Sequence, residues 1–194
     1  MDNFEHQHFI LFKPYGYLSQ FVYPLNRRKN KKLLGELYNF PEKIMSIGRL
    51  DEASEGLLLL TTDGKVSQYI RSAKVEKEYL AQVDGIVTED AMQALRNGVV
   101  IAVNGEDYTT KPAKIELLTE TPSLPARAKK IRDERHGPTS WISITIREGK
   151  FRQVRKMTAA VGFPTLRLVR SRIGNITIDK LKAGEVLPVI ELLV

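Results

Sequence analysis

The sequence predicts an α+β protein with a mixed, largely antiparallel sheet. Short apolar runs and stretches of alternating apolar and polar residues, bounded by Gly, Pro, Asn or Asp, are typical of strands. The few helical segments do not alternate regularly with these strands, as they would around a parallel sheet. A chain of 194 residues can bury one sizeable core without disulfides, and this chain has no cysteine.

The first third of the chain contains two apolar runs that read as strands. The run at 9–12 is closed by Pro14 and Gly16, because proline cannot donate to a strand ladder and glycine tolerates a turn. Four consecutive leucines at 57–60 predict a short strand buried on both faces. The elements expected here are a strand at 9–12, a helix at 33–38, a strand at 57–60 and a helix at 65–71.

The middle third combines strands with one capped helix. From Glu76 onward, alternate positions 79 to 83 share one strand face. Thr88 is a typical N-cap for a helix that ends at Asn97. Two further strands, at 99–103 and 113–118, are expected around an Asn-Gly turn at 104–105.

The segment from Glu120 to Pro138 predicts a long mobile loop. It holds three prolines, a dense charge run and little apolar periodicity. Loops of this length are usually functional or disordered. Its cations suggest that it becomes ordered on RNA.

The last third begins with a half-buried strand. Ile142, Ile144 and Ile146 alternate with polar residues, and a helix with basic residues on one face then runs to Gly162. Further strands are expected at 166–170, 173–178 and 185–193.

Positive charge is clustered along the chain, whose formal net charge is +7. Residues 27–32 contain five cations and no acid, 127–135 five cations and two acids, and 147–156 five cations and one acid. Further arginines recur at 167–172. One such run alone is usually a solvated surface, but several in one modest chain favour a polyanionic partner such as nucleic acid.

Several other classes of protein are not expected. The histidines at 6, 8 and 136 lack metal-ligand spacing, so we expect no metal and no cofactor. No apolar run approaches the ~20 residues that span a bilayer, and the first residues lack a secretory signal pattern. We therefore expect a cytoplasmic protein without a membrane partner.

Asp51 allows two interpretations. It follows Gly48 in a tight turn, where an Asp side chain most often stabilises the turn by bonding to the nearby backbone. On these residues alone, that structural interpretation is favoured. The same turn leads into the buried leucine strand, and catalytic groups are often held in loops at the ends of rigid elements. The wider pattern favours the second interpretation.

Four ordered motifs resemble the RsuA/RluA superfamily of pseudouridine synthases. The central one is Gly-Arg-Leu-Asp at 48–51 with Ser-Glu-Gly-Leu at 54–57, followed by Leu60-Thr61. The others are Lys-Pro-Tyr-Gly at 13–16, Lys-Glu-Tyr at 77–79 and the basic segment at 148–157. The similarity runs from about residue 9 to 173.

Residues 138–141 and 161–168 resemble one branch of that superfamily, ribosomal large subunit pseudouridine synthase E. The resemblance implies one compact catalytic domain over 1–194, with two lobes flanking a basic active-site cleft and no N-terminal S4 RNA-binding domain. The chain departs from the family pattern where Phe12 replaces an asparagine and where Glu52-Ala53 replaces Arg-Asp.

The resemblance also implies roles for individual residues. Asp51 is the catalytic carboxylate, Arg155 pairs with it, Tyr79 stacks on the target uracil and assists the proton step, and Leu168 forms an apolar wall of the base pocket. Without the resemblance, Arg155 would be one more phosphate contact and Tyr79 a core residue. We expect a further set of cations to contact RNA, namely Lys13, Arg27, Arg28, Arg49, Lys150, Arg152, Lys156, Arg167 and Arg170.

The implied function is isomerisation of one uridine in large-subunit (23S) ribosomal RNA to pseudouridine, by a monomer that needs no protein partner. Whether the carboxylate attacks the sugar or acts as a base there stays open. The alternative is a non-catalytic rRNA-binding or ribosome-assembly protein on the same fold. An acid in a basic groove would repel phosphate, which argues against a pure binder.

Overall fold

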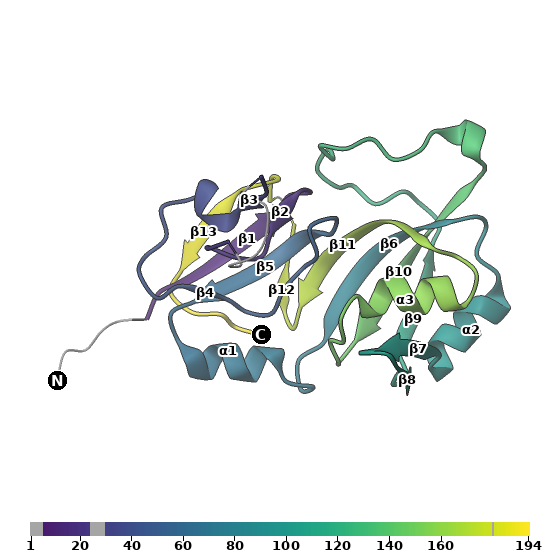
Figure 1. The fold of residues 1–194 in the computed structure, drawn as a ribbon, viewed down its shortest axis with the longest axis horizontal. Coiled ribbons are helices and arrows are strands. Elements are labelled where there is room, and N and C mark those ends of the chain that lie inside the picture. Colours follow the sequence, from purple (N-terminus) through teal and green to yellow (C-terminus); the bar gives the residue numbers. More distant parts are fainter. Residues whose placement is uncertain (1–5, 24–29, 180) are drawn as a thin grey trace.

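The structure is a computed structural model that describes residues 6–23, 30–179 and 181–194. Within these residues, nine strands form one mixed sheet (Figure 1). Its central path is β13 (Val186–Val189), β1 (His8–Lys13), β5 (Glu55–Thr61), β11 (Thr165–Ile173), β6 (Lys77–Asp84), β10 (Thr139–Ile146) and β9 (Lys114–Leu118). Short strands β4 (Met45–Ser46) and β12 (Ile176–Thr177) attach to β5 and β11. Among these strands only β5 and β11 pair in parallel, which confirms the predicted α+β class with a largely antiparallel sheet.

Strand β5 is buried along its whole length, as the leucine run predicted. Leu58 and Leu60 pack with Phe9 in one hydrophobic cluster, whereas Leu57 and Leu59 pack in another. Successive side chains of a strand point to opposite faces, so both faces of β5 are covered. This burial gives the segment that precedes β5 a rigid support.

The parallel seam between β5 and β11 requires glycine at position 56. Gly56 has a φ of +102°, and an added Cβ would clash with the Arg170 carbonyl oxygen and lie 2.8 Å from Arg170 N. The two backbones therefore approach each other too closely for any side chain. The seam joins the part of the sheet around β1 to the part around β6.

The sheet around β6 and β10 carries its own core. Ala81, Val83, Ile142 and Ile144 are fully buried there. Helix α2 (Glu89–Asn97) and helix α3 (Gln153–Ala160) contribute apolar residues to it. Thr88 Oγ1 accepts a hydrogen bond from Ala91 N at 3.3 Å, so it caps α2 as predicted.

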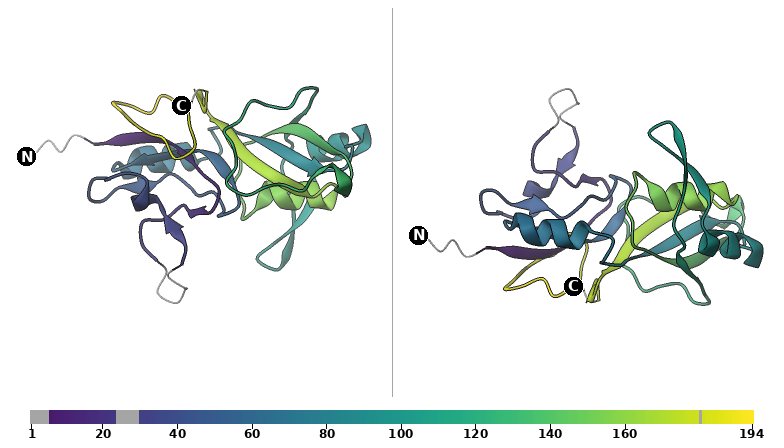
Figure 2. Two further views of the ribbon diagram at one scale, coloured as in Figure 1. Left: turned by 90° about the horizontal axis from the view of Figure 1, so that it is seen from above. Right: turned by 90° about the horizontal axis from the view of Figure 1, so that it is seen from below.

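A third helix, α1 (Gly64–Arg71), follows β5. The Asp63 carboxylate caps it by accepting a hydrogen bond from Lys65 N at 2.7 Å. Figure 2 shows α3 and the segment around β2 (Tyr17–Leu18) and β3 (Lys32–Leu33) on one side of the sheet, opposite the segment that follows β12.

Three predicted elements differ from the structure. The helix expected at 33–38 is one turn of 3-10 helix, η1 (Leu34–Glu36), after β3. The Asn-Gly turn joins β7 (Val100–Val103) to β8 (Glu106–Thr109), while residues 114–118 pair with β10. The strands expected at 166–170 and 173–178 are the single strand β11 with the short β12. In each case the local pattern indicated an element or a turn at the right place, but not its length or its pairing.

In the part of the chain that the structure describes, no helix is long and apolar enough to cross a membrane. The described residues also contain no group of three or more His, Cys, Asp or Glu side chains arranged to hold a metal ion. One sheet runs continuously through the described residues. The expected division into two lobes that flank a cleft stays a prediction.

Candidate active site

The turn that carries Asp51 connects β4 to β5, and hydrogen bonds hold its backbone in place. Gly48 adopts a φ of +70°. Ser19 Oγ donates to the Leu50 carbonyl at 2.9 Å and accepts from Leu50 N at 3.0 Å. Ser54 N donates to the Asp51 carbonyl at 3.0 Å. The backbone of Asp51 is therefore held in place, while its side chain stays 22% exposed.

Two arginines at the start of α3 approach the Asp51 carboxylate. Arg152 Nη1 donates to Asp51 Oδ2 at 3.1 Å, and Arg155 Nε lies 3.8 Å from the same oxygen. Arg152 has a φ of +53°, a left-handed conformation that is uncommon outside glycine and clusters at functional sites. Arg155 alone was expected to pair with Asp51, whereas the structure brings both arginines to the carboxylate.

Arg155 also holds the backbone on either side of the site. Its Nη2 donates to the Ala53 carbonyl at 3.0 Å and to Ser54 Oγ at 3.2 Å, and Nη1 donates to the Thr165 carbonyl at 3.3 Å. Burial lowers the pKa of this guanidinium, the neighbouring Arg152 lowers it further, and Asp51 partly offsets both. Arg155 is thus a buried brace between α3, β11 and the Asp51 turn.

A pocket opens in front of Asp51 and brings together residues from four parts of the sequence. Tyr79 from β6 and Leu168 from β11, the two residues predicted to contact the base, both lie on its wall. The Arg170 guanidinium lies 6.0 Å from the centre of the Tyr79 ring. The lining residues are Arg49, Leu50, Asp51, Ser54, Tyr79, Ile146, Gly149, Lys150, Arg152, Gln153, Val154 and Leu168. This pocket therefore combines one acid, an aromatic ring, apolar walls and several cations.

Three of the cations expected to contact RNA are buried. Lys13, Arg167 and Arg170 are 0%, 9% and 4% exposed. Lys13 Nζ donates to the Pro14 and Tyr17 carbonyls at 3.0 and 2.7 Å, and burial lowers its pKa to about 7. We correct the assignment of these three residues from phosphate contact to internal support, because their charged groups are turned to protein partners.

Arg167 and Arg170 support β5 from the neighbouring strand. Arg167 makes a two-pronged ion pair with Glu55, with nitrogen–oxygen distances of 3.1 and 2.9 Å. Arg170 Nε donates to the Leu57 carbonyl at 2.7 Å. Both side chains therefore tie the two strands of the parallel seam together.

Other expected RNA contacts lie at or near the surface. Arg49 and Lys150 are exposed and line the pocket, and Lys150 Nζ lies 4.6 Å from the centre of the Tyr108 ring. Lys156 is half-buried and donates to the Ala102 carbonyl at 2.6 Å. Arg27 and Arg28 lie outside the described residues.

Three further residues of the site were not predicted, namely Ser54, Glu55 and Gln153. Ser54 accepts from Arg155, and the buried Gln153 links Lys150 N to the Glu148 carboxylate. Glu55 is 2% exposed and is the buried partner of Arg167. Ser54 and Glu55 were visible in the central motif, and an acid at the start of a fully buried strand is a signal that a cation must be buried beside it.

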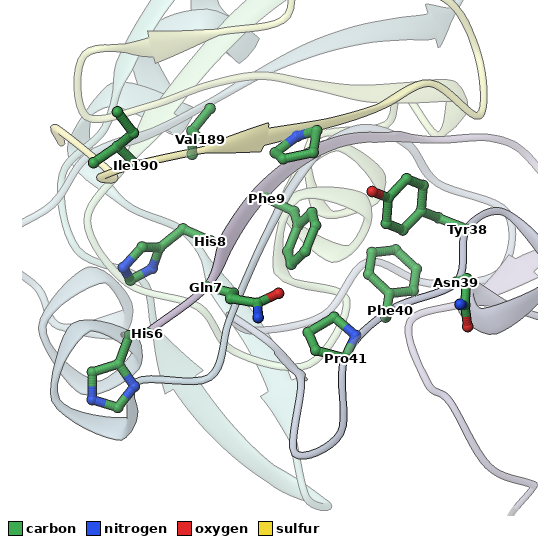
Figure 3. A pocket seen from close by; sticks show the side chains of 11 residues that line it. His6, Gln7, His8, Phe9, Tyr38, Asn39, Phe40, Pro41, Val189 and Ile190 are labelled. Carbon is green, nitrogen blue, oxygen red and sulfur yellow. The ribbon is translucent and has the colours of Figure 1, made fainter. Parts of the chain in front are cut away.

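A second pocket lies at the other end of β1 and β5 (Figure 3). Phe9, Tyr38 and Phe40 form its aromatic wall, with ring centroids 5.1 to 5.6 Å apart. His6 and His8 lie at its rim near the end of β5. None of its described lining residues is acidic, so this second pocket offers no carboxylate for the reaction.

Comparisons with known proteins show the family to which this chain belongs. The profile of the family described as RNA pseudouridylate synthase matches residues 7–160. Ribosomal large subunit pseudouridine synthase E of Xanthomonas axonopodis pv. citri is 42% identical over 174 residues, which cover 89% of this chain and 88% of that protein. Ribosomal large subunit pseudouridine synthase B of Bacillus subtilis is 33% identical over 181 residues, covering 92% of this chain and 66% of that protein. The predicted resemblance to the superfamily, with the E branch among its relatives, is confirmed.

The fold has a counterpart among solved structures. A crystal structure described as pseudouridylate synthase has a TM-score of 0.74 at 33% sequence identity, covering 95% of this chain and 70% of that one. The human RNA pseudouridylate synthase domain containing 1, at 16% identity and a TM-score of 0.57, shares the fold alone. With a family profile that matches most of its length and relatives above 40% identity, the chain belongs to the RNA pseudouridylate synthase family and is an isomerase that acts on RNA.

Proposed function

We propose that this protein converts one uridine of large-subunit ribosomal RNA to pseudouridine, with Asp51 as the catalytic carboxylate. The observation that carries this proposal is a partly exposed carboxylate, flanked by two arginines, in a pocket that also contains Tyr79 and Leu168. The substrate class follows from the relatives named ribosomal large subunit pseudouridine synthase E.

The reaction breaks the bond between C1′ and N1, turns the uracil and joins C1′ to C5. The C5 proton is lost and N1 gains one, so no external oxidant or energy source is needed. One carboxylate suits this chemistry, because it can attack an electron-poor C1′ or act as a base at the sugar. Arg152, through its hydrogen bond, and Arg155, through its charge, would hold the Asp51 carboxylate aimed at the pocket.

Tyr79 and Leu168 would hold the uracil between an aromatic face and an apolar wall. A uridine inside folded RNA has to be turned out of its stack, which costs a few kcal/mol that protein contacts must offset. Stacking on Tyr79 supplies part of this compensation. The Tyr79 hydroxyl would assist removal of the C5 proton.

The surface around the pocket would bind the RNA backbone through Arg49, Lys150, Arg152 and Lys156. We further propose that the protein acts in the cytoplasm as a monomer without a protein partner. The non-catalytic alternative receives no support, because a carboxylate at the centre of these cations would weaken phosphate binding.

Mapping of pseudouridine in ribosomal RNA from cells with and without the gene tests this function. We expect one large-subunit uridine to lose modification, and purified protein alone to restore it on transcript rRNA. Sedimentation of the protein with that RNA tests the monomer. An unchanged modification map would contradict the proposed substrate.

A further inference from the structure

The long loop between β9 and β10 bends back toward β5 and β11 (Figure 1). Leu124 packs against the core cluster that includes Leu57 and Leu59. The Pro125 carbonyl accepts a hydrogen bond from Arg167 Nη2 at 2.8 Å. One bend of the loop is therefore docked beside the start of β5 rather than free in solvent.

Arg127 anchors this bend, although the charge run had marked it as a phosphate contact. Its side chain is 10% exposed, and Nε lies 3.1 Å from Glu55 Oε2 in an ion pair that is not aligned as a hydrogen bond. Its guanidinium carbon lies 4.2 Å from the centre of the Tyr15 ring. The guanidinium is thus nearly buried against a carboxylate and an aromatic ring, which leaves little of its charge for RNA.

The same guanidinium reaches the turn that holds Asp51. Arg127 Nη2 lies 3.5 Å from the Ala53 carbonyl, which also accepts from Arg155 Nη2 at 3.0 Å. The preceding carbonyl, that of Glu52, accepts from Gly16 N at 2.9 Å. Arg127 therefore contacts both the Asp51 turn and, through Tyr15, the turn that braces it.

We propose that Arg127 is a positioning residue for Asp51, which acts by clamping the β9–β10 loop onto the turn at 51–54. This inference rests on the proposed function, because it assigns the loop a task in that same reaction. Without Arg127, the Glu55 carboxylate would keep only Arg167 as its ion-pair partner, and the Ala53 carbonyl would keep only its hydrogen bond from Arg155. The pair of Asp51 and Arg155 would then lose its fixed geometry, and misplacement by about 1 Å can cost about a hundredfold in rate.

The test compares Arg127→Met with the wild type and with Lys65→Met, which removes an exposed cation from α1. We expect Arg127→Met to lower the single-turnover rate at saturating RNA by about ten- to a hundredfold. RNA affinity and its salt dependence should stay close to wild type, because Arg127 is not a phosphate contact. Arg127→Lys, which keeps the charge without the planar fork, should recover part of the rate.

Hydrogen exchange provides a readout that does not depend on the substrate. The Ser54 amide, which donates to the Asp51 carbonyl, should exchange faster in Arg127→Met, while the Leu58 amide within β5 should not change. If no ribosomal uridine is modified by the wild type, the proposed function fails, and this exchange measurement still decides whether Arg127 holds the turn.

Two results would overturn the proposal. An unchanged rate with unchanged Ser54 exchange would reduce Arg127 to an anchor without influence on Asp51. Weaker binding with a shallower salt dependence and an unchanged rate would restore Arg127 as a phosphate contact. If Arg127→Met does not fold, Tyr15→Leu decides, because it removes only the ring: a lower rate supports the clamp and a wild-type rate contradicts it.

Discussion

At the scale of single residues, the two arginines beside Asp51 differ in exposure. The Arg155 side chain is 11% exposed and is bonded to three backbone or side-chain oxygens, whereas the Arg152 side chain is 41% exposed. A buried, multiply bonded guanidinium has few alternative positions, and an exposed one can reach a ligand. We infer that Arg155 fixes the geometry of Asp51 and that Arg152 connects the site to RNA.

For Tyr79 we predict that the ring and the hydroxyl contribute separately to the reaction. We expect Tyr79→Phe to keep the stacking surface but slow the proton step, and Tyr79→Ala to lose both. Single-turnover rates and RNA affinities of the two variants measure this separation. A wild-type rate in Tyr79→Ala would return Tyr79 to a purely structural role.

Lys13 provides a prediction about pH. Burial lowers its pKa from 10.5 to about 7, so between these values the unfolded chain binds more protons at this lysine than the folded chain. The destabilising contribution of Lys13 is fully present below pH 7 and is relieved as the pH rises toward 10.5, by up to about 1.4 kcal/mol per pH unit.

Unfolding by urea at several pH values compares the wild type with Lys13→Met. The free energy of unfolding of the wild type should gain on that of the variant between pH 7 and 9. A difference that stays constant over this range would show that Lys13 titrates normally.

At the scale of elements, the seam between β5 and β11 joins the turn of Asp51 to the strand of Leu168. We expect Gly56→Ala to lower the free energy of unfolding by about 3 kcal/mol, because the added Cβ would clash with the backbone of Arg170 at a positive φ. Gly64→Ala is the matched control, since Gly64 has open space around its Cβ position. Equal stabilities of the two variants in urea unfolding would contradict the close approach.

An element could be predicted where the sequence pattern that specifies it lies within the element itself. The leucine run of β5 and the Thr88 cap of α2 are local patterns, and both are confirmed. The Asn-Gly turn was local too, but β8, which follows it directly, is polar and mostly exposed, so it lacks the apolar pattern of a strand and was missed. The burial of Lys13, Arg167 and Arg170 depends on Glu55 and on carbonyls that only the folded chain brings near. Charge runs in a sequence do not distinguish such cations from exposed ones.

At the scale of the whole molecule, the positive charge divides into internal and external parts. Arg127, Arg167 and Arg170 are buried or nearly so, whereas Arg49 and Lys150 are exposed beside the pocket of Asp51. The clusters of positive charge in the sequence therefore include cations that are not available to RNA. Affinity should depend on the exposed group near the pocket more than on the total charge.

The salt dependence of RNA binding tests this division. We expect Arg49→Gln and Lys150→Gln each to weaken binding and to reduce the slope of log affinity against log salt by about 0.7 to 0.9. Lys65→Gln, on exposed α1, should leave the slope unchanged. Equal slopes in all three variants would show that the RNA-binding face lies elsewhere on the molecule.

The proposed reaction depends on the Asp51 carboxylate in this pocket. Release of tritium from 5-tritiated uridine in large-subunit rRNA, measured with Asp51→Asn, tests it most directly. We predict no detectable release by the variant, with RNA affinity within about threefold of the wild type because binding rests on the surrounding cations. Sustained turnover by Asp51→Asn, with normal affinity, would contradict the assignment of Asp51.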